Sequence, residues 1–387
     1  MPPTHLRGFM KRVLILGGGF GGIATARRLK NKLGNEAEVI MVDRRPNFMV
    51  GFRKSWALIG ESPLEEGQRP LESLTKFGVD VRRASVDSIN PKDKSAVIDG
   101  EKIQADAVVV ALGAELMPNA VQGFKEHAYN VYDPDDIPRA ERALNEFKGG
   151  RLVIGIFGAP YKCAPAPYEM ALLINEKLKK RGVKATIEVF SPQPMSLPIL
   201  GQASCDSVEG RLEDYGIKFH PNHKALSIEA NEVVFENSRI AYDLLLGVPP
   251  HKAPAVVRES GLVGPSGWVE INPRTMETAF EGMYAIGDLT QIMLANKKPL
   301  PKAGLFVELM GETVADRLID VFNGSQPSAT FSGEGGCYFE VGGGEAMMVQ
   351  GNFLAEPEPI VTLTESSKQY LDQKRKFETD RLEKWFG

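Results

Sequence analysis

Cys163 lies in the segment PYKCAPAPYE, where its neighbours favour the thiolate form of its side chain. Lys162 precedes it directly, and Pro167 predicts that a helix begins just after it. A cation and the positive end of a helix both lower the pKa of a thiol, and the thiolate is the form that attacks sulfur. Glu169, in the first turn of that helix, is a candidate proton acceptor, and equally an ordinary partner of the helix dipole. Cys163 is therefore a candidate redox residue, with an inert loop thiol as the alternative.

The sequence contains two other cysteines, Cys205 and Cys337. Three cysteines are too few for a secreted disulfide scaffold, so a disulfide here is expected to be redox-active. Cys205 lies in SCDSVEGRLEDYG, which predicts a helix, and we interpret it as a partly buried thiol without a redox role. The sequence has neither a CxxCH haem motif nor the cysteine spacing of an iron–sulfur cluster, so we expect an external electron acceptor and no metal.

Gly17, Gly19 and Gly22 form a GxGxxG motif between a predicted strand and a predicted helix. In that context backbone amides and the helix N-terminus bind the pyrophosphate of a dinucleotide. Asp43, followed by Arg44, ends the next predicted strand, where a carboxylate accepts hydrogen bonds from an adenosine ribose. The motif therefore predicts a dinucleotide site, with a glycine turn that only packs helix on strand as the alternative.

A second strand–loop–helix unit lacks this motif. Its loop reads GAPYKC from Gly158 to Cys163, with proline and bulky side chains where the backbone would have to approach a pyrophosphate. The loop therefore disfavours NADH or NADPH, although a degenerate nicotinamide site stays open.

Two strand–helix–strand units position these residues, one over residues 11–43 and one over residues 151–192, which indicates an internal duplication. The segment GLFVELMGETVADRLIDVFNG predicts an amphipathic helix where the chain returns to the first unit. The predicted fold class is α/β, with two Rossmann-like three-layer domains and a small C-terminal region that carries an amphipathic helix. The expected division is a discontinuous first domain (10–115 and 265–325), a second Rossmann-like domain (116–264) and a C-terminal region (326–387).

Length and composition agree with a multidomain globular protein. The 387 residues are 43% hydrophobic and 25% charged, with a net charge of -4, which gives no nucleic-acid signature. The opening MPPTHLRGFM lacks an apolar signal-peptide core, and no apolar run approaches the roughly 18 residues of a spanning helix. We expect the protein on the cytoplasmic side, either free or lying on a membrane without crossing it.

Three ordered motifs between Lys11 and about Gly324 resemble the flavin fingerprints of FAD-dependent disulfide reductases: the glycine turn, the segment ALGA with Ala111 and Gly113, and the pair Gly287-Asp288. The loop PYKCAPAPYE is also very similar to the PYKCPPAPYE-type loop of sulfide:quinone oxidoreductases and of the flavoprotein subunit of flavocytochrome c sulfide dehydrogenase. The resemblance implies FAD as cofactor, with Asp288 at its ribityl-phosphate part and Lys302 at the pyrimidine edge of the flavin.

The same resemblance implies a redox pair between Cys163 and Cys337, with Cys337 on the flavin side and Cys163 carrying a persulfide. Two departures matter. Many sulfide:quinone oxidoreductases carry a third cysteine upstream, whereas no cysteine precedes Cys163 here, so sulfur release is expected to use two cysteines. The region after the second strand also lacks the cysteine that attaches FAD covalently in some members, so FAD is expected to be non-covalent.

Quinone is the expected electron acceptor, with sulfide as electron donor. Aromatic candidates for a quinone slot are Phe306, Phe339 and Phe353. The terminal helix mixes apolar and basic residues in a way that suits the surface of a membrane (Leu371, Leu382, Trp385 and Phe386 among Lys374, Arg375, Lys376, Arg381 and Lys384). The alternative is a salt-bridged helix docked on its own protein, because acidic residues are interleaved too. His251 is a candidate for proton transfer to quinone or a structural histidine.

Three other functions stay open. A cytochrome-linked sulfide dehydrogenase flavoprotein fits the two-cysteine pattern. A type II NADH:quinone dehydrogenase shares the fold but needs the glycines missing before Cys163. A flavin-bound scaffold that acts through partners would not need either cysteine. The sequence leaves the sulfur product, the type of quinone, a homo-oligomer and the physiological direction undecided.

Overall fold

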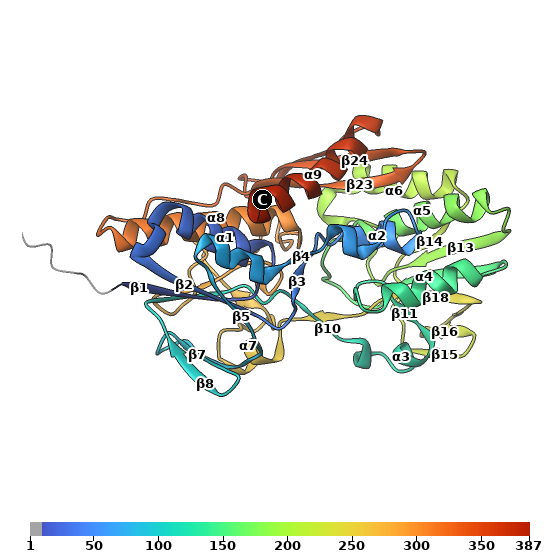
Figure 1. The fold of residues 1–387 in the computed structure, drawn as a ribbon. Coiled ribbons are helices and arrows are strands. Elements are labelled where there is room, and N and C mark those ends of the chain that lie inside the picture. Colours follow the sequence, from blue (N-terminus) through green and yellow to red (C-terminus); the bar gives the residue numbers. More distant parts are fainter. Residues whose placement is uncertain (1–9) are drawn as a thin grey trace, which may run out of the picture.

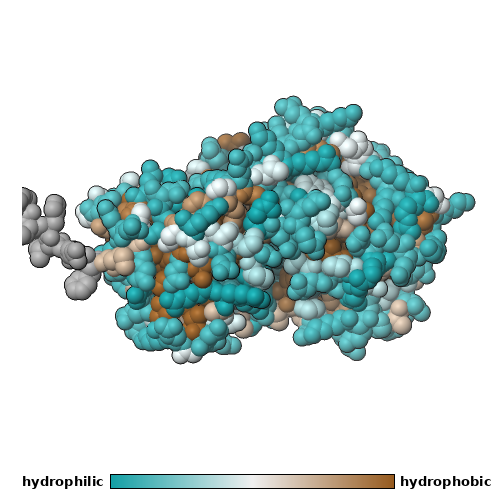
Figure 2. Space-filling model, viewed as in Figure 1, coloured by the Kyte–Doolittle hydropathy of each residue, from teal (hydrophilic) through white to brown (hydrophobic). Residues whose placement is uncertain are grey.

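The computed structural model describes residues 10–387. The expectation about a signal peptide concerns the segment MPPTHLRGFM, which lies almost entirely outside the described residues. Two sheet-centred halves lie side by side, and the C-terminal strands and helix lie over both (Figure 1). The face shown in Figure 2 is mainly hydrophilic, and its hydrophobic residues form separate patches.

The first half is built on a parallel sheet of five strands in the order β21-β9-β1-β2-β5. Their bounds are β1 Lys11–Leu16, β2 Ala37–Asp43, β5 Asp80–Arg83, β9 Ala107–Val110 and β21 Met283–Ala285. The central strands are buried on both faces. Helices α1 (Phe20–Leu33) and α8 (Gly304–Phe322) pack together on one face, and the opposite face is covered by a second hydrophobic cluster that includes residues of β6 (Val86–Asn90), β7 (Ser95–Ile98) and β8 (Glu101–Gln104). Strand β21 comes from late in the chain, so this sheet is completed by residues that follow the second half in the sequence.

The second half repeats this plan with the order β11-β18-β12-β13-β14, again parallel. The bounds are β11 Tyr129–Asn130, β12 Gly150–Ile156, β13 Ala185–Phe190, β14 Lys218–His220 and β18 Leu244–Val248. Helices α4 (Ile137–Glu146), α5 (Ala166–Lys180) and α6 (Gln202–Asp214) accompany it. The predicted fold class is confirmed; the residue boundaries of the domains stay predictions.

The C-terminal region joins the two halves. Its antiparallel strands are β23 (Glu334–Gly342), β24 (Glu345–Asn352) and β25 (Ile360–Leu363). Strand β23 contacts both α5 and α8, and helix α9 (Lys368–Phe386) packs on β24. A second link is the short pairing of β10 (Glu115–Leu116) with β19 (His251–Lys252).

Helix α9 is docked on its own protein, so the four apolar residues expected at a membrane surface are not available there. Leu371, Leu382, Trp385 and Phe386 are all buried, three of them in the core of the first half. Ion pairs fix the polar side: Arg381 and Lys384 bind Glu308 of α8 at 3.0 and 2.8 Å. Hydrophobic burial and ion pairing therefore confirm the docked-helix alternative and correct the membrane-contact reading of these four side chains.

Within residues 10–387, no helix combines the length and the apolar character needed to cross a bilayer.

The remaining elements are small. The other described strands and helices are β3 Asn47–Phe48, α2 Arg53–Leu58, β4 Arg69–Pro70, α3 Phe124–His127, β15 Ser227–Glu229, β16 Glu232–Val234, β17 Arg239–Ala241, α7 Ala255–Glu259, β20 Val269–Glu270 and β22 Thr290–Gln291.

Candidate redox site

The fold brings Cys163 and Cys337 together. Cys163 lies in the loop between β12 and α5, Cys337 lies on β23, and the two thiols are close enough to shift each other's pKa. The neighbouring Cys337 thiol lowers the pKa of Cys163, whereas the Cys163 thiol and burial raise the pKa of Cys337 well above its usual range. Both thiols are free and partly exposed, whereas Cys205 is fully buried in the core of the second half. Two residues far apart in the chain therefore form one dithiol site.

The backbone of Cys163 is held in an unusual conformation by three hydrogen bonds. Its φ of 52° lies in the left-handed region, which costs a non-glycine residue about 1–3 kcal/mol. Its amide donates to the carbonyl oxygen of Lys302 at 2.9 Å, and its own carbonyl accepts from the amide of Ala166 at 3.0 Å and the hydroxyl of Tyr132 at 2.8 Å. These contacts aim the thiol and link the cysteine loop directly to the segment that carries Lys302.

Charged side chains near Cys163 come from several elements. Lys54 of α2 and Lys374 of α9 favour the Cys163 thiolate, and Glu169 of α5 opposes it. Burial, and then the neighbouring Lys162, lower the pKa of Lys54 to about 7. Neither Lys54 nor Lys374 was predicted as a site residue, because no local pattern marks a side chain that reaches the thiol from a remote helix.

Glu169 is buried beside the dithiol rather than solvated at the end of its helix. Its Oε2 accepts the amide of Glu340 at 2.9 Å and is 2.8 Å from Nζ of Lys374. Burial raises the pKa of Glu169, although Lys374 counteracts part of that effect. A carboxyl group with a raised pKa next to a thiol pair can accept a proton and return it.

The glycine turn has the shape of a pyrophosphate cradle. A Cβ on Gly22 would overlap the carbonyl oxygen of Gly17, and a Cβ on Gly17, whose φ is +114°, would overlap the carbonyl oxygen of Ala111. A Cβ on Gly19 would meet nothing within 4 Å, and this residue precedes α1 as an N-cap without a side-chain cap hydrogen bond. Open space therefore lies beside the start of α1, where no side chain caps the first amides, as binding of a dinucleotide requires.

Asp43 lies where a ribose would be held. Its carboxylate accepts the amides of Gly18 and Arg45, each at 2.8 Å. Arg45 also ion-pairs with it, although both Arg44 and Arg45 are exposed. Arg44 stays a predicted cofactor-binding residue, and Arg45 is a neighbour of Asp43 that the sequence did not single out.

The other flavin motifs lie at the adjoining strand ends. Ala111 follows β9, with its amide bonded to the carbonyl oxygen of Leu16 at 2.7 Å, and Gly113 and Gly287 have positive φ values of 69° and 82°. Lys302 donates to the carbonyl oxygens of Asp288 and Thr290 at 2.6 and 2.9 Å. Burial lowers the pKa of Lys302 to about 8. A small cavity lies against Gly287, Asp288 and Lys302, and the carbonyl oxygen of Lys302 accepts the amide of Cys163.

The expected aromatic slot is not formed by all three phenylalanines. Phe306 and Phe353 stack edge to face with centroids 4.9 Å apart in the core of the first half, whereas Phe339 is buried in the core of the second half. All three are buried, so a quinone would have to displace other groups to reach their rings. Their role in quinone binding stays a prediction.

His251 is structural in its present environment. Its Nδ1 lies 2.8 Å from the carbonyl oxygen of Pro249, and its ring packs against Tyr132. Burial, and then the nearby Lys162, lower its pKa to about 3. The imidazole is therefore neutral near pH 7, with the Nδ1 proton bonded to the carbonyl.

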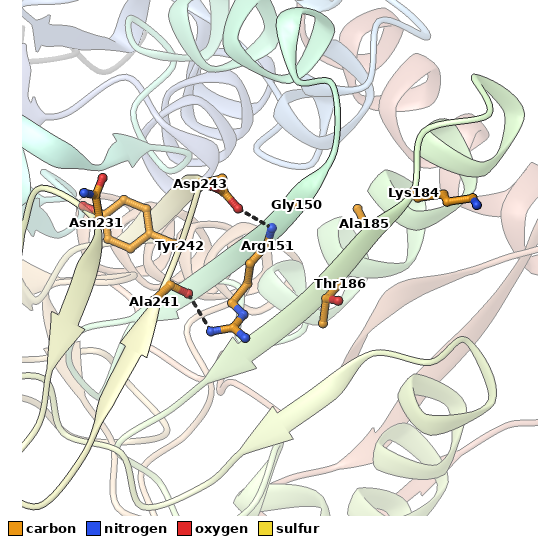
Figure 3. A pocket seen from close by; sticks show the side chains of 9 residues that line it. All are labelled: Gly150, Arg151, Lys184, Ala185, Thr186, Asn231, Ala241, Tyr242 and Asp243. Carbon is orange, nitrogen blue, oxygen red and sulfur yellow. Dashed lines mark hydrogen bonds between the residues drawn. The ribbon is translucent and has the colours of Figure 1, made fainter.

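A larger open pocket lies at the opposite edge of the second sheet. Figure 3 shows Arg151 beside Asp243, whose carboxylate accepts the Arg151 amide at 2.7 Å. The pocket lies at the amino end of β12, while the cysteine loop follows its carboxyl end. Ligands of such sheets bind at the carboxyl ends of the strands, so this pocket is separate from the redox site.

Comparison with known proteins supports the assignment of the cofactor. The family model "pyridine nucleotide-disulphide oxidoreductase" matches residues 11–299. The mitochondrial sulfide:quinone oxidoreductase of Mus musculus is 23% identical over 363 residues, covering 89% of this chain and 79% of the relative. A type II NADH:quinone oxidoreductase of Staphylococcus saprophyticus is 24% identical over 347 residues, covering 83% and 85%.

A solved structure matches almost the whole chain. The crystal structure of the sulfide:quinone oxidoreductase from Aquifex aeolicus aligns with a TM-score of 0.88 and 25% identity, covering 97% of this chain and 91% of that one. The match includes both sheet-containing halves and the C-terminal region. The glycine turn, the open N-terminus of α1 and Asp43 fit a bound FAD. The chain therefore belongs to the pyridine nucleotide-disulphide oxidoreductase family and is an FAD-dependent oxidoreductase.

Proposed function

We propose that the protein oxidises sulfide through the Cys163–Cys337 pair and FAD, and passes the electrons to a quinone. The observation that carries the proposal is the pair of adjacent thiols of Cys163 and Cys337, together with the hydrogen bond from the Cys163 amide to the carbonyl oxygen of Lys302, beside Asp288. The similarity to proteins named sulfide:quinone oxidoreductases supports the substrate and the acceptor.

The first chemical step is attack of HS⁻ on the oxidised cysteine pair. A sulfur–sulfur bond forms between sulfide and Cys163, and the bond between the cysteines breaks, which leaves a persulfide on Cys163 and a thiolate on Cys337. Oxidation of these two groups back to a sulfur-bridged pair releases two electrons. Lys54 and Lys374 favour negative charge at Cys163, so they stabilise the persulfide anion from which the electrons leave.

Glu169 takes up the proton that the persulfide loses. Its carboxylate is buried beside both cysteines. Because burial raises the pKa of Glu169, binding of a proton to this carboxylate costs less free energy than it would in water. The proton then leaves for solvent or for the reduced acceptor.

FAD supplies the two-electron acceptor between the cysteines and quinone. Its pyrophosphate would lie at Gly17, Gly19 and Gly22, its adenosine ribose at Asp43, and its ribityl-phosphate part at Asp288. Lys302 would place a positive charge at the flavin ring. Binding is proposed to be non-covalent, because no cysteine precedes Cys163 in the sequence.

Quinone is proposed to reach the flavin from a membrane on whose surface the protein lies. NADH is disfavoured as an electron donor because the loop that would hold its pyrophosphate is filled by Tyr161, which is buried and bonded to the carbonyl oxygen of Ala164 at 3.0 Å. A soluble cytochrome as acceptor is the alternative for the second half-reaction.

The deciding experiment adds sulfide anaerobically to the flavin-loaded protein and follows the flavin absorbance. We expect rapid bleaching in the wild type and in Cys205→Ser, and none in Cys163→Ser or Cys337→Ser. Recovery of absorbance on adding a short-chain quinone, but not cytochrome c, would establish the acceptor. Bleaching by NADH and not by sulfide would overturn the proposal.

A further inference from the structure

Lys374 is a fully buried cation on the last helix of the chain, and it lies between two buried carboxylates. Its Nζ is 2.8 Å from Oε2 of Glu169 and 2.9 Å from Oε2 of Glu340. Glu169 lies six residues after Cys163, in the first turn of α5, and Glu340 lies three residues after Cys337 on β23. One side chain of α9 thus contacts both elements that carry the cysteines.

The surroundings of this cluster supply little further charge. Nζ of Lys374 lies 5.2 Å from the ring centre of Phe52 and 5.5 Å from that of Trp56, and the Trp56 indole donates to Glu340 at 3.0 Å. The next buried charges on α2 and α9 are Arg53 and Glu378, which pair with each other at 2.9 Å. Lys54 and the two thiols complete the groups that face the cluster.

The number of charges in the cluster indicates that Lys374 determines whether Glu169 stays ionised. Two ionised carboxylates and one ammonium leave a net charge of one negative unit in a buried site. Without the ammonium, two carboxylates would share a dry pocket, and close carboxylates cannot both stay ionised near neutral pH. Glu169 would then hold its proton, and the negative charge beside the thiols would lose its counter-ion.

We propose that Lys374, supplied by α9, is a positioning residue of the redox site: it keeps Glu169 ionised and aligned to accept the proton released at the cysteine pair. The proposal rests on the proposed function and extends it to the C-terminal helix. In this role Lys374 acts through Glu169, in addition to favouring negative charge at Cys163. Docking of α9 is therefore a condition for proton transfer as well as for stability.

The primary test compares Lys374→Met with Lys384→Met, a matched change on the same helix whose ion pairs are with Glu308 and Glu312. Both proteins are loaded with FAD, and the rate of flavin bleaching by sulfide is measured from pH 5 to 9. Loss of the cation raises the pKa of Glu169, so the acid limb of the Lys374→Met profile should move to higher pH by roughly one unit or more. Lys384→Met should leave the limb in place, and equal profiles for the two variants would overturn the proposal.

A double variant tests whether Lys374 acts through Glu169. In a Glu169→Gln background the additional change Lys374→Met should not move the acid limb further, because the titrating group is gone. An equal shift in both backgrounds would show a direct effect on the thiols and would overturn the proposed route.

Two further measurements keep the test decisive. If Lys374→Met binds no FAD, Lys374→Met with Glu340→Gln restores the net charge of the cluster while still removing the cation from Glu169. Its acid limb should remain above that of the wild type, and a limb at or below the wild-type position would contradict the proposal. In the reduced, flavin-free protein, the pH dependence of Cys163 alkylation measures the direct effect of Lys374 on the thiol; a shift in Lys374→Met as large as that of the acid limb would contradict the proposed route through Glu169. Failure of wild-type bleaching would instead remove the proposed function itself.

Discussion

The two loops that follow β1 and β12 occupy equivalent positions in a duplicated fold, yet they present different groups to the interior. The first loop ends at glycines whose missing side chains leave the amides of α1 exposed to a ligand. The second loop contains the buried Tyr161 and then the strained Cys163. The same strand–loop–helix unit therefore binds a cofactor in one copy and presents a thiol in the other.

The difference lies in what fills the space before the helix. At α1 the space is left to a pyrophosphate, whereas at α5 it is filled by the chain itself, through the hydroxyl of Tyr132 and the carbonyl oxygen of Lys302. A phosphate-binding turn requires positions without side chains. A thiol that is held in one orientation requires surrounding groups that contact its loop. The comparison of the two loops therefore favours the first copy as the one that binds a nucleotide.

The largest expected effect tests whether the second loop carries the chemistry. Cys163→Ser should slow flavin reduction by sulfide by roughly 10³-fold or more, the scale on which removal of a nucleophile acts. Stopped-flow absorbance measures the rate, and Cys205→Ser, which changes a buried thiol of the second core, serves as control. If the Cys163→Ser protein reacted as fast as the control, the proposal that the second loop carries the chemistry would be contradicted.

The next effect tests the first loop. Gly22→Ala should prevent FAD binding, because its methyl group would overlap the Gly17 carbonyl and force the turn apart. Gly19→Ala is the matched change into open space, so it should fold normally and lose FAD affinity only if a ligand occupies that space. The ratio of flavin to protein absorbance and the melting temperature separate the two outcomes. Wild-type flavin content in Gly22→Ala would contradict the cradle.

A smaller effect concerns the ribose end of the first loop. Asp43→Ala removes the acceptor of two backbone amides and of the proposed ribose hydrogen bonds, so FAD affinity should fall about tenfold, equivalent to about 1.4 kcal/mol. Fluorescence titration of the flavin-free protein measures the dissociation constant. Arg44→Ala, at an exposed neighbour, should change it little. An equal loss in both variants would mean that Asp43 has no special role.

The smallest effect tests how the second loop is aimed. Tyr132→Phe removes one hydrogen bond to the Cys163 carbonyl, worth about 1 kcal/mol, so reduction by sulfide should slow about fivefold while flavin content is unchanged. Tyr168→Phe, whose hydroxyl bonds instead to the carbonyl of Ser196, is the control. A larger defect in Tyr168→Phe than in Tyr132→Phe would contradict the proposed aim of the loop.

The sequence by itself determined the fold class, the glycine cradle and FAD. Each depends on residues close together in the chain: Gly17, Gly19 and Gly22 are required by one turn, and strand periodicity follows from local alternation. The cysteine pairing was predicted from resemblance, since nothing local to Cys163 identifies Cys337 as its neighbour.

Only the tertiary structure decided what surrounds the thiols and where α9 goes. Lys54, Lys374 and Glu340 reach the site from a helix, another helix and a strand, and Arg45 rather than Arg44 meets Asp43. The apolar residues of α9 suited a membrane and a protein core equally well in the sequence. Burial depends on which surfaces meet after long-range packing, and a one-dimensional pattern of polarity gives the apolar face of a helix without giving its partner.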